Sequence, residues 1–171
     1  MARAPCTWVA KRSPPRGSAE PDPCHVFEPN DPLWRERAGE IFSRAPFVCE
    51  LGIRLVDLGP GWVESELLVE ARHMQQDGVV HAGVQATLAD HSAGAAAGTL
   101  APAGHATLSV ELKIQLLRPA LGERLRCRAQ VIRPGRTIVA TEAWVYAVAA
   151  GEEKLVSQLT ATMTYAAQKT G

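Results

Sequence analysis

Most of this chain alternates apolar and polar side chains, and two segments do not. Residues 62–71 alternate apolar or small side chains with glutamates. This period of two predicts a strand, and the turn sequence Gly59-Pro60-Gly61 before it predicts a hairpin with residues 50–58. Further alternating runs predict four more strands, over residues 105–117, 123–133, 137–149 and 154–166.

Two segments lack this alternation and suit helices instead. Asp31 can cap a helix that begins at Pro32 and runs toward Phe42, with apolar side chains on one face. The second segment, residues 77–98, reads DGVVHAGVQATLADHSAGAAAG and is dominated by alanine and glycine. Because small side chains let other elements pack close, we predict a core helix, in which Asp90 would be costly without a partner or a task.

The order of these elements limits the fold. Short connections among the last four strands favour an antiparallel sheet, whose apolar face must cover another element. The alanine-rich helix is the only predicted element of suitable length. We therefore predict an α+β fold, in which an antiparallel sheet of about six strands wraps around a central helix and a short N-terminal helix precedes it.

The composition narrows the class of protein. The chain has 171 residues, of which 46% are hydrophobic, and it carries 18 basic and 18 acidic side chains. One domain over residues 31–167 accounts for the length, and the basic, proline-rich residues 1–30 predict a disordered extension. The balanced charge argues against nucleic acid or an anionic membrane as a partner, and no run approaches the ~18 apolar residues of a membrane span.

The cysteines indicate a compartment. Cys6, Cys24, Cys49 and Cys127 lie far apart, with no C-x-x-C pair and no histidine at ligand spacing. We therefore expect free thiols, a reducing cytoplasmic location and no metal site.

Two segments carry a family resemblance. HAGVQATLADHSAGAAAG, followed by LSVELKIQLLRPALGE, resembles the PaaI-type acyl-CoA thioesterases, whose pattern has His-Gly-Gly, then Leu-Ala-Asp, then a strand ending near Pro-Ala-x-x-Gly. The resemblance covers residues 46–166 and implies the hotdog fold, a homodimer or homotetramer, and cofactor-free hydrolysis of an acyl-CoA substrate. The chain departs from the pattern at Ala82, which keeps an amide donor only if it needs no positive φ.

Thioester hydrolysis needs donors for an oxyanion and a group that delivers oxygen. The amides of Ala82 and Gly83 would lie unpaired in the first turn of the helix, at the positive end of its dipole. Asp90 would act as general base or nucleophile. A rise of about 1.5 Å per residue places Asp90 roughly 12 Å along the axis from Ala82, so one carbonyl cannot reach both. This separation predicts a two-fold dimer with composite sites.

The resemblance implies further roles near this pair. His81 would orient the first turn rather than transfer protons, although it could also be an N-terminal cap or a packing residue. Gln75, or Gln76 if the loop shifts by one, would hold the thioester or the water through its amide. Ser109 would position the attacking water across from the carboxylate, although a hydroxyl on a polar strand face can also be inert. His91 points about 100° away from its neighbour on the helix, so we interpret it as a packing residue or a subunit contact.

Arginines are candidates for the coenzyme end. Arg133 and Arg136 flank a Pro-Gly turn, and Arg118 lies at a strand end. A guanidinium pairs well with phosphate, so we predict that these three bind the CoA phosphates. The alternating arginines within residues 124–128 are interpreted instead as a solvated sheet face.

Two other functions fit the same segments. A hydratase or dehydratase on this fold would move a proton next to a carbonyl and leave the thioester intact. A non-catalytic acyl-CoA binding module would use the helix purely as core, with Asp90 as a structural acid.

Overall fold

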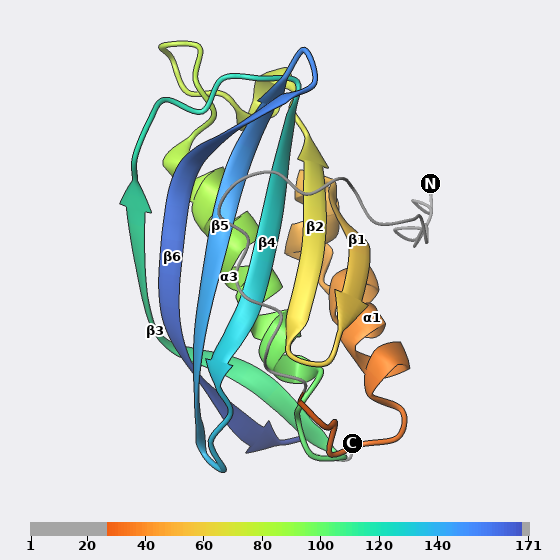
Figure 1. Cartoon of the computed structure of the whole chain (residues 1–171). Coiled ribbons are helices and arrows are strands. Elements are labelled where there is room, and N and C mark those ends of the chain that lie inside the picture. The colour runs from red at the N-terminus through yellow and green to blue at the C-terminus, as the bar shows by residue number, and fades with distance from the viewer. Residues whose placement is uncertain (1–26, 169–171) are drawn as a thin grey trace, which may run out of the picture.

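The computed structural model describes residues 27–168 (Figure 1). Its helices and strands follow in the order α1 (Trp34–Arg44), α2 (Pro46–Leu51), β1 (Ile53–Gly59), β2 (Trp62–Leu68), the 3₁₀ helix η1 (Ala71–His73), α3 (Ala82–Gly98), β3 (His105–Leu116), β4 (Arg124–Arg133), β5 (Ile138–Ala149) and β6 (Glu152–Ala167).

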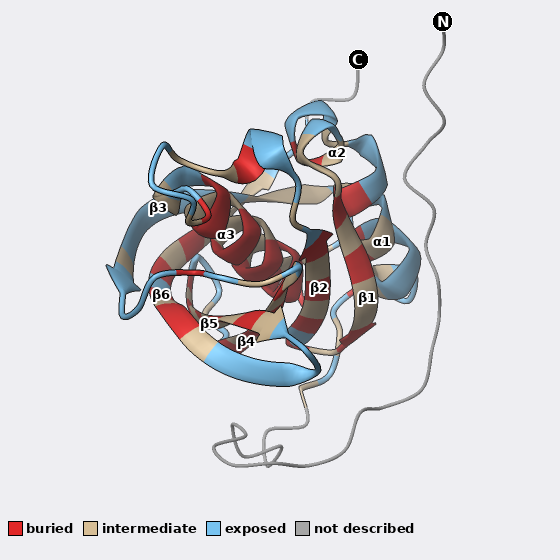
Figure 2. Ribbon diagram, turned by 90° about the horizontal axis from the view of Figure 1, so that it is seen from above, coloured by how far each residue is buried: buried red, intermediate tan, exposed pale blue. Residues whose placement is uncertain are grey.

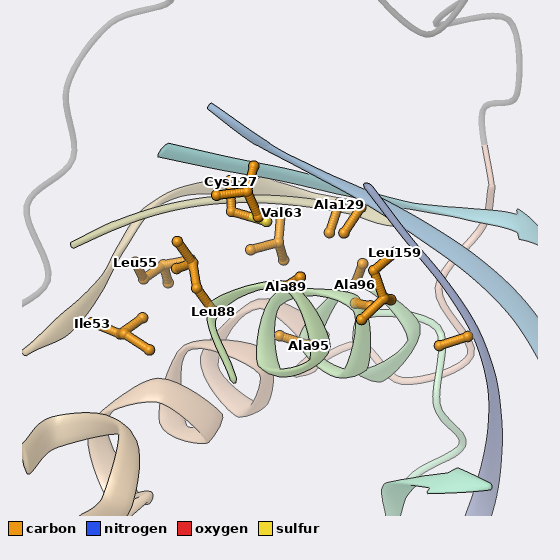
Figure 3. Packing of buried hydrophobic residues seen from close by; sticks show 14 of the residues in the cluster. Ile53, Leu55, Val63, Leu88, Ala89, Ala95, Ala96, Cys127, Ala129 and Leu159 are labelled. Atoms are coloured by element: carbon orange, nitrogen blue, oxygen red, sulfur yellow. The ribbon is translucent and has the colours of Figure 1, made fainter. Parts of the chain in front are cut away.

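The strands form one six-stranded antiparallel sheet in the order β1-β2-β4-β5-β6-β3. Figure 2 shows this sheet curving around α3, with α1 and α2 beside the helix on the side away from β4 and β5. Ala89 and Ala96 on α3 are fully buried, and Figure 3 shows them next to strand residues such as Val63 and Leu159. Because these helix side chains are single methyl groups, the strands approach the helix closely. The predicted α+β architecture is confirmed.

β3 lies farther from β4 than the short connection between them suggests. It pairs with β6 at the edge of the sheet, and residues 117–123 cross the sheet end to reach β4 (Figure 1). Three strand spacings, roughly 14 Å, separate the two strands, a span within reach of this segment. Apolar side chains along this edge strand remain largely exposed, namely Leu108, Val110, Leu112 and Leu116.

The structure corrects the predicted start of the first strand. Residues 50–52 are not extended, because Pro46–Leu51 form the short helix α2. Pro46 suits the first helical turn, and Gly52, at φ 79°, ends the helix by donating its amide to the Cys49 carbonyl 3.0 Å away. β1 therefore begins at Ile53.

The first helix starts slightly later than predicted. α1 begins at Trp34 rather than Pro32, and Asp31 lies buried just before it. One carboxylate oxygen of Asp31 accepts the Leu33 amide at 3.0 Å, and the other pairs with Arg37 Nε at 2.8 Å. The predicted cap is therefore wrong in detail, because Leu33 occupies the N-cap position and Asp31 binds the turn that precedes the helix.

The described chain begins within the predicted N-terminal extension. Phe27 packs over Gly61, and Asn30 Nδ2 donates to the Leu100 carbonyl at 2.7 Å. Residues 1–26 lie outside the described residues, so the predicted disorder is untested there. Among residues 27–168, no helix is both long and apolar enough to cross a membrane.

Candidate active site

The N-terminus of α3 is capped by its own histidine. The Gly83 amide donates to His81 Nδ1 at 2.9 Å. A Cβ at Gly83 would lie 3.0 Å from this nitrogen, so the imidazole would have to shift by a few tenths of an ångström for any other residue at this position. His81 therefore shapes the first turn, as predicted. The Gly83 amide, however, is occupied and is not a free oxyanion donor in this structure.

The Ala82 amide is the donor left open. The amides of Val84 and Gln85 both point to the His81 carbonyl, at 3.0 and 3.3 Å, whereas within the described chain the Ala82 amide has no hydrogen-bond partner. Among the described residues other than glycine, only Ala150 has a positive φ. Alanine thus fits the first helical position, and its N–H lies at the positive end of the helix dipole.

Asp90 and Ser109 are brought together. Ser109 Oγ donates to Asp90 Oδ1 at 2.8 Å and lies 3.3 Å from Met163 Sδ. Asp90 occupies a half-exposed side of α3, so its carboxylate is accessible while one of its oxygens is held. The sequence predicted that Ser109 positions a water across from the carboxylate, whereas in the structure its hydroxyl binds the carboxylate directly.

A β-bulge points Ser109 at the helix. Strict alternation predicts that Ser109 shares a face with Glu111. In the structure, Ser109 pairs with the buried Met163 while Glu111 pairs with Thr162, and the extra residue Val110 lies between them. A bulge inserts one residue and redirects the neighbouring side chains. Ser109 therefore faces α3 and Glu111 faces outward.

The predicted glutamines lie in the turn before the helix. The Gln75 amide donates to the Val79 carbonyl at 2.9 Å, and its carbonyl accepts the Gly78 amide at 3.2 Å. The side-chain amides of Gln75 and Gln76 both approach Asp77 Oδ2, at 3.5 and 3.1 Å. Neither glutamine is hydrogen-bonded to the carboxylate on α3 in the described chain.

His91 is a packing residue. Its ring meets Phe42 of α1 edge-on, with centroids 4.6 Å apart and an interplanar angle of 83°. Burial lowers the pKa of His91, and the negative charge of Asp90 opposes this shift without cancelling it. The interpretation of His91 as a packing residue is confirmed.

The arginines of β4 neutralise carboxylates on the outer face of the sheet. Arg124 binds Glu66 and Arg126 binds Glu64, each at 3.1 Å, and Arg126 also binds Glu153. Arg128 bridges Glu64 and Glu153 at 3.4 and 3.3 Å. The row was predicted to be a solvated face, but the ion pairs leave Arg126 and Arg128 only 17% and 20% exposed, and its role is structural.

The three arginines predicted to bind phosphate lie at opposite ends of the molecule. Arg118 is close to the start of β6, where it donates to the Leu155 carbonyl at 2.8 Å. Arg133 ends β4 and Arg136 follows in the next turn. The 10-residue strand β4 separates the two ends by roughly 30 Å. Within one chain they cannot bind a single phosphate.

The buried thiol of Cys127 offers no nucleophile. Burial raises the pKa of Cys127 to about 12, which keeps it a thiol at neutral pH. In the part of the chain that the structure describes, no three His, Cys, Asp or Glu side chains gather where they could hold a metal ion.

Sequence analysis missed two buried polar residues beside the site, His73 and Gln85. The His73 carbonyl accepts the His81 amide at 2.8 Å, and Gln85 Nε2 donates to the Val80 carbonyl at 3.1 Å. A lone histidine in a polar loop has no periodic signal. The glutamine was a detectable exception, because it falls on the apolar face of the core helix.

Comparison with known proteins identifies relatives. The model of the thioesterase superfamily matches residues 77–152. A putative esterase of Haemophilus influenzae is 34% identical over 136 residues, which are 75% of this chain and 95% of that protein. Human acyl-coenzyme A thioesterase 13 is 35% identical over 107 residues, which are 62% of this chain and 74% of that protein.

Solved structures of other proteins have the same fold as this chain. A thioesterase family protein from Silicibacter pomeroyi superposes with a TM-score of 0.77 at 37% identity, covering 78% of this chain and 98% of that one. The PaaI protein of E. coli shares the fold, with a TM-score of 0.70 at 20% identity over 79% of this chain and 94% of that one. The chain therefore belongs to the thioesterase superfamily, has the hotdog fold that its sequence resemblance implied, and is an enzyme of the thioester hydrolase class.

Proposed function

We propose that this protein hydrolyses acyl-CoA thioesters to a free acid and CoA. Asp90 acts as general base on a water, or attacks the carbonyl carbon itself, and the Ala82 amide stabilises the oxyanion. With Asp90 as base, the C–S bond breaks and the leaving sulfur takes the proton that Asp90 removed from water. With Asp90 as nucleophile, the C–S bond breaks to leave an acyl-Asp90 anhydride and the thiolate of CoA, and water then hydrolyses the anhydride and supplies the proton. Human acyl-coenzyme A thioesterase 13, a relative at 35% identity, supports this class of substrate.

The observation that carries the proposal is the hydrogen bond between Ser109 and Asp90. Asp90 is the only acidic side chain of α3, and a carboxylate on a helix in the core of the fold needs a hydrogen-bond partner. The Ser109 hydroxyl holds one of its oxygens at 2.8 Å from a strand that bulges at this position. This arrangement fixes the direction of the carboxylate and leaves its other oxygen for water or the thioester.

We propose that the working unit is a homodimer, which can pair further into a tetramer. Asp90 follows Ala82 by roughly 12 Å along α3, too far for one carbonyl, and a second antiparallel helix would bring the two groups together. The edge strand β3 supports this arrangement, because its unpaired backbone and exposed apolar side chains, among them Leu108 and Leu112, suit another copy of the chain.

A composite site also accommodates the predicted arginines. Arg118 lies at the end of the sheet that holds the N-terminus of α3, since the nearby Ala120 carbonyl accepts the Val80 amide at 3.0 Å. Arg133 and Arg136 lie at the opposite end. A site built from the helix N-terminus of one chain and Asp90 of the other can draw on both ends for the CoA phosphates. A reducing cytoplasmic location, which we also propose, is compatible with the buried thiol of Cys127.

The proposal is tested by incubating the purified protein with a panel of aryl, short-chain and long-chain acyl-CoAs and a thiol reagent. Free CoA should appear with multiple turnover, and Asp90→Asn should lower kcat about 10²-fold or more while leaving KM nearly unchanged. If the acyl group is modified but stays attached to CoA, the protein is instead a hydratase or dehydratase. Saturable binding without product would identify a binding module.

A single turnover in ¹⁸O-labelled water separates the two roles open to Asp90. Direct attack, followed by attack of water at the Asp90 carbonyl carbon of the anhydride, releases an unlabelled first acid and leaves the label in Asp90. General-base catalysis labels the acid from the first turnover and leaves Asp90 unlabelled.

A further inference from the structure

Gln85 is a polar side chain in an apolar place. It lies in the first turns of α3 with only 4% of its surface exposed, among the residues that the sheet covers. Its Nε2 donates to the Val80 carbonyl at 3.1 Å, while its Oε1 is buried without a partner in the described chain. A buried acceptor without a partner costs stability that an apolar side chain of similar size would not.

The bond from Gln85 is one of three that fix the segment entering the helix. The Val80 amide donates to the Ala120 carbonyl at 3.0 Å, and the His81 amide donates to the His73 carbonyl at 2.8 Å. Residues 80–81 are therefore held by α3 through Gln85, by the loop after β3, and by η1.

His73 makes one of these anchors rigid. It is fully buried, its Nδ1 accepts the Glu70 amide, and its Nε2 faces the Leu51 carbonyl, each at 2.9 Å. This pattern requires a neutral ring with the proton on Nε2. The ring thereby ties η1 to the end of α2 and fixes the carbonyl that holds His81.

These bonds determine where the Ala82 amide points. The peptide group between His81 and Ala82 is planar and trans, so its N–H is directed opposite to its C=O. The His81 carbonyl is held along the helix by the Val84 and Gln85 amides. The Ala82 N–H therefore points away from α3 at its N-terminus. This direction is kept as long as the peptide group between Val80 and His81 does not rotate.

We propose that Gln85 is a positioning residue for hydrolysis, because its amide holds the Val80 carbonyl and so keeps the Ala82 N–H directed at the oxyanion. The inference rests on the proposed thioesterase function. With the Gly83 amide capped by His81, a single backbone donor must serve, which makes its direction important.

The test compares Gln85→Met with a matched control. Methionine keeps the length and volume of the side chain but removes the donor to Val80 and the unpartnered acceptor. We expect kcat to fall about tenfold with KM unchanged, less than the 10²-fold or more for loss of an oxyanion donor. The control is Ser92→Ala, which removes two buried hydrogen bonds, one to the Leu88 carbonyl on the same helix and one shared with Ser65 Oγ of β2. Its melting temperature should fall while kcat stays unchanged.

A spectroscopic readout separates positioning from a general loss of stability. A 2-oxoalkyl-CoA, in which a methylene separates sulfur from a ¹³C-labelled ketone, reports hydrogen bonding through its carbonyl stretch. The stretch should shift to lower frequency on binding wild type and Ser92→Ala, and shift less on binding Gln85→Met. Gln85→Asn, which keeps the amide but shortens its reach, should behave like the Met variant.

The possible results distinguish the two proposals. If wild type hydrolyses acyl-CoA and a folded Gln85 variant keeps both kcat and the carbonyl shift, the positioning role is wrong. If wild type neither turns over acyl-CoA nor polarises the ketone, the proposed function itself is wrong. Hydrogen exchange in wild type needs no variant. A His81 amide protected less than about tenfold would contradict a firmly held segment, and strong protection would support it.

Discussion

Two inactive variants should restore activity when they share a dimer. Ala82→Pro removes the N–H proposed to bind the oxyanion, and Asp90→Asn removes the carboxylate. The structure indicates that proline is tolerated at position 82, because the Ala82 amide has no partner in the described chain. His81, at φ −58° and ψ 139°, already has the conformation favoured before proline. Each homodimer should therefore fold, and each should lose about 10²-fold or more in kcat.

The expected recovery follows from the geometry. Since the two groups are roughly 12 Å apart along one helix, each site is built from the Ala82 amide of one chain and Asp90 of the other. Every mixed dimer of the two variants then contains one intact site. Random pairing makes about half of the dimers mixed, so co-refolding should restore roughly a quarter of wild-type activity. Mixed dimers purified through two different tags should reach about half.

A reciprocal mixture provides the control. In a dimer of wild type with the Ala82→Pro/Asp90→Asn double variant, shared sites are both broken, whereas sites confined to one chain leave one intact. The reasoning is refuted if this second mixed dimer retains about half of wild-type activity while the first recovers none. Circular dichroism should show beforehand that the proline variant is folded.

Three further changes test other parts of the structure. Ser109→Ala should lower kcat about ten- to hundredfold by freeing Asp90, and unchanged turnover of the folded variant would make this hydroxyl dispensable. Because burial lowers the pKa of His91, the unfolded chain binds more protons at this residue than the folded chain does, and the free energy of unfolding should fall as the pH drops below about 6.5. In urea unfolding, His91→Phe should weaken this pH dependence. Deleting residues 1–26 should leave the melting temperature unchanged, whereas extending the deletion through residues 27–30 should lower it, since those residues pack on the domain.

The central helix and its carboxylate were predictable from the sequence. Residues 82–98 consist largely of alanine and glycine, and Asp90 lies among them. The small side chains indicated close packing, and an acidic residue in such a helix indicated a functional site. The alternating runs likewise predicted β2 and the last four strands. These signals are local, because they depend on side-chain size and polarity at fixed spacings along one element.

Other features depend on contacts that the sequence does not encode locally. The bulge at Val110 is invisible, because Leu108 to Leu116 alternate without interruption and valine is an ordinary strand former. Pro46 and Gly52 are typical of the start and the end of a helix. The segment between them is too short to show a helical repeat of apolar residues, so α2 was not predicted. The sequence did predict that His81 orients the first turn of α3, although histidine is not among the usual capping residues, and the bond from the Gly83 amide to His81 Nδ1 bears this out.

The bulge in β3 also bears on how the protein avoids unwanted association. An exposed edge strand with apolar side chains invites any extended segment to add to the sheet, which is a route to aggregation. An inserted residue interrupts the ladder of backbone donors and acceptors midway along this edge, so a straight, regular strand cannot pair along its whole length. The β-bulge that directs the Ser109 hydroxyl at Asp90 thus also makes the β3 edge a poor template for aggregation.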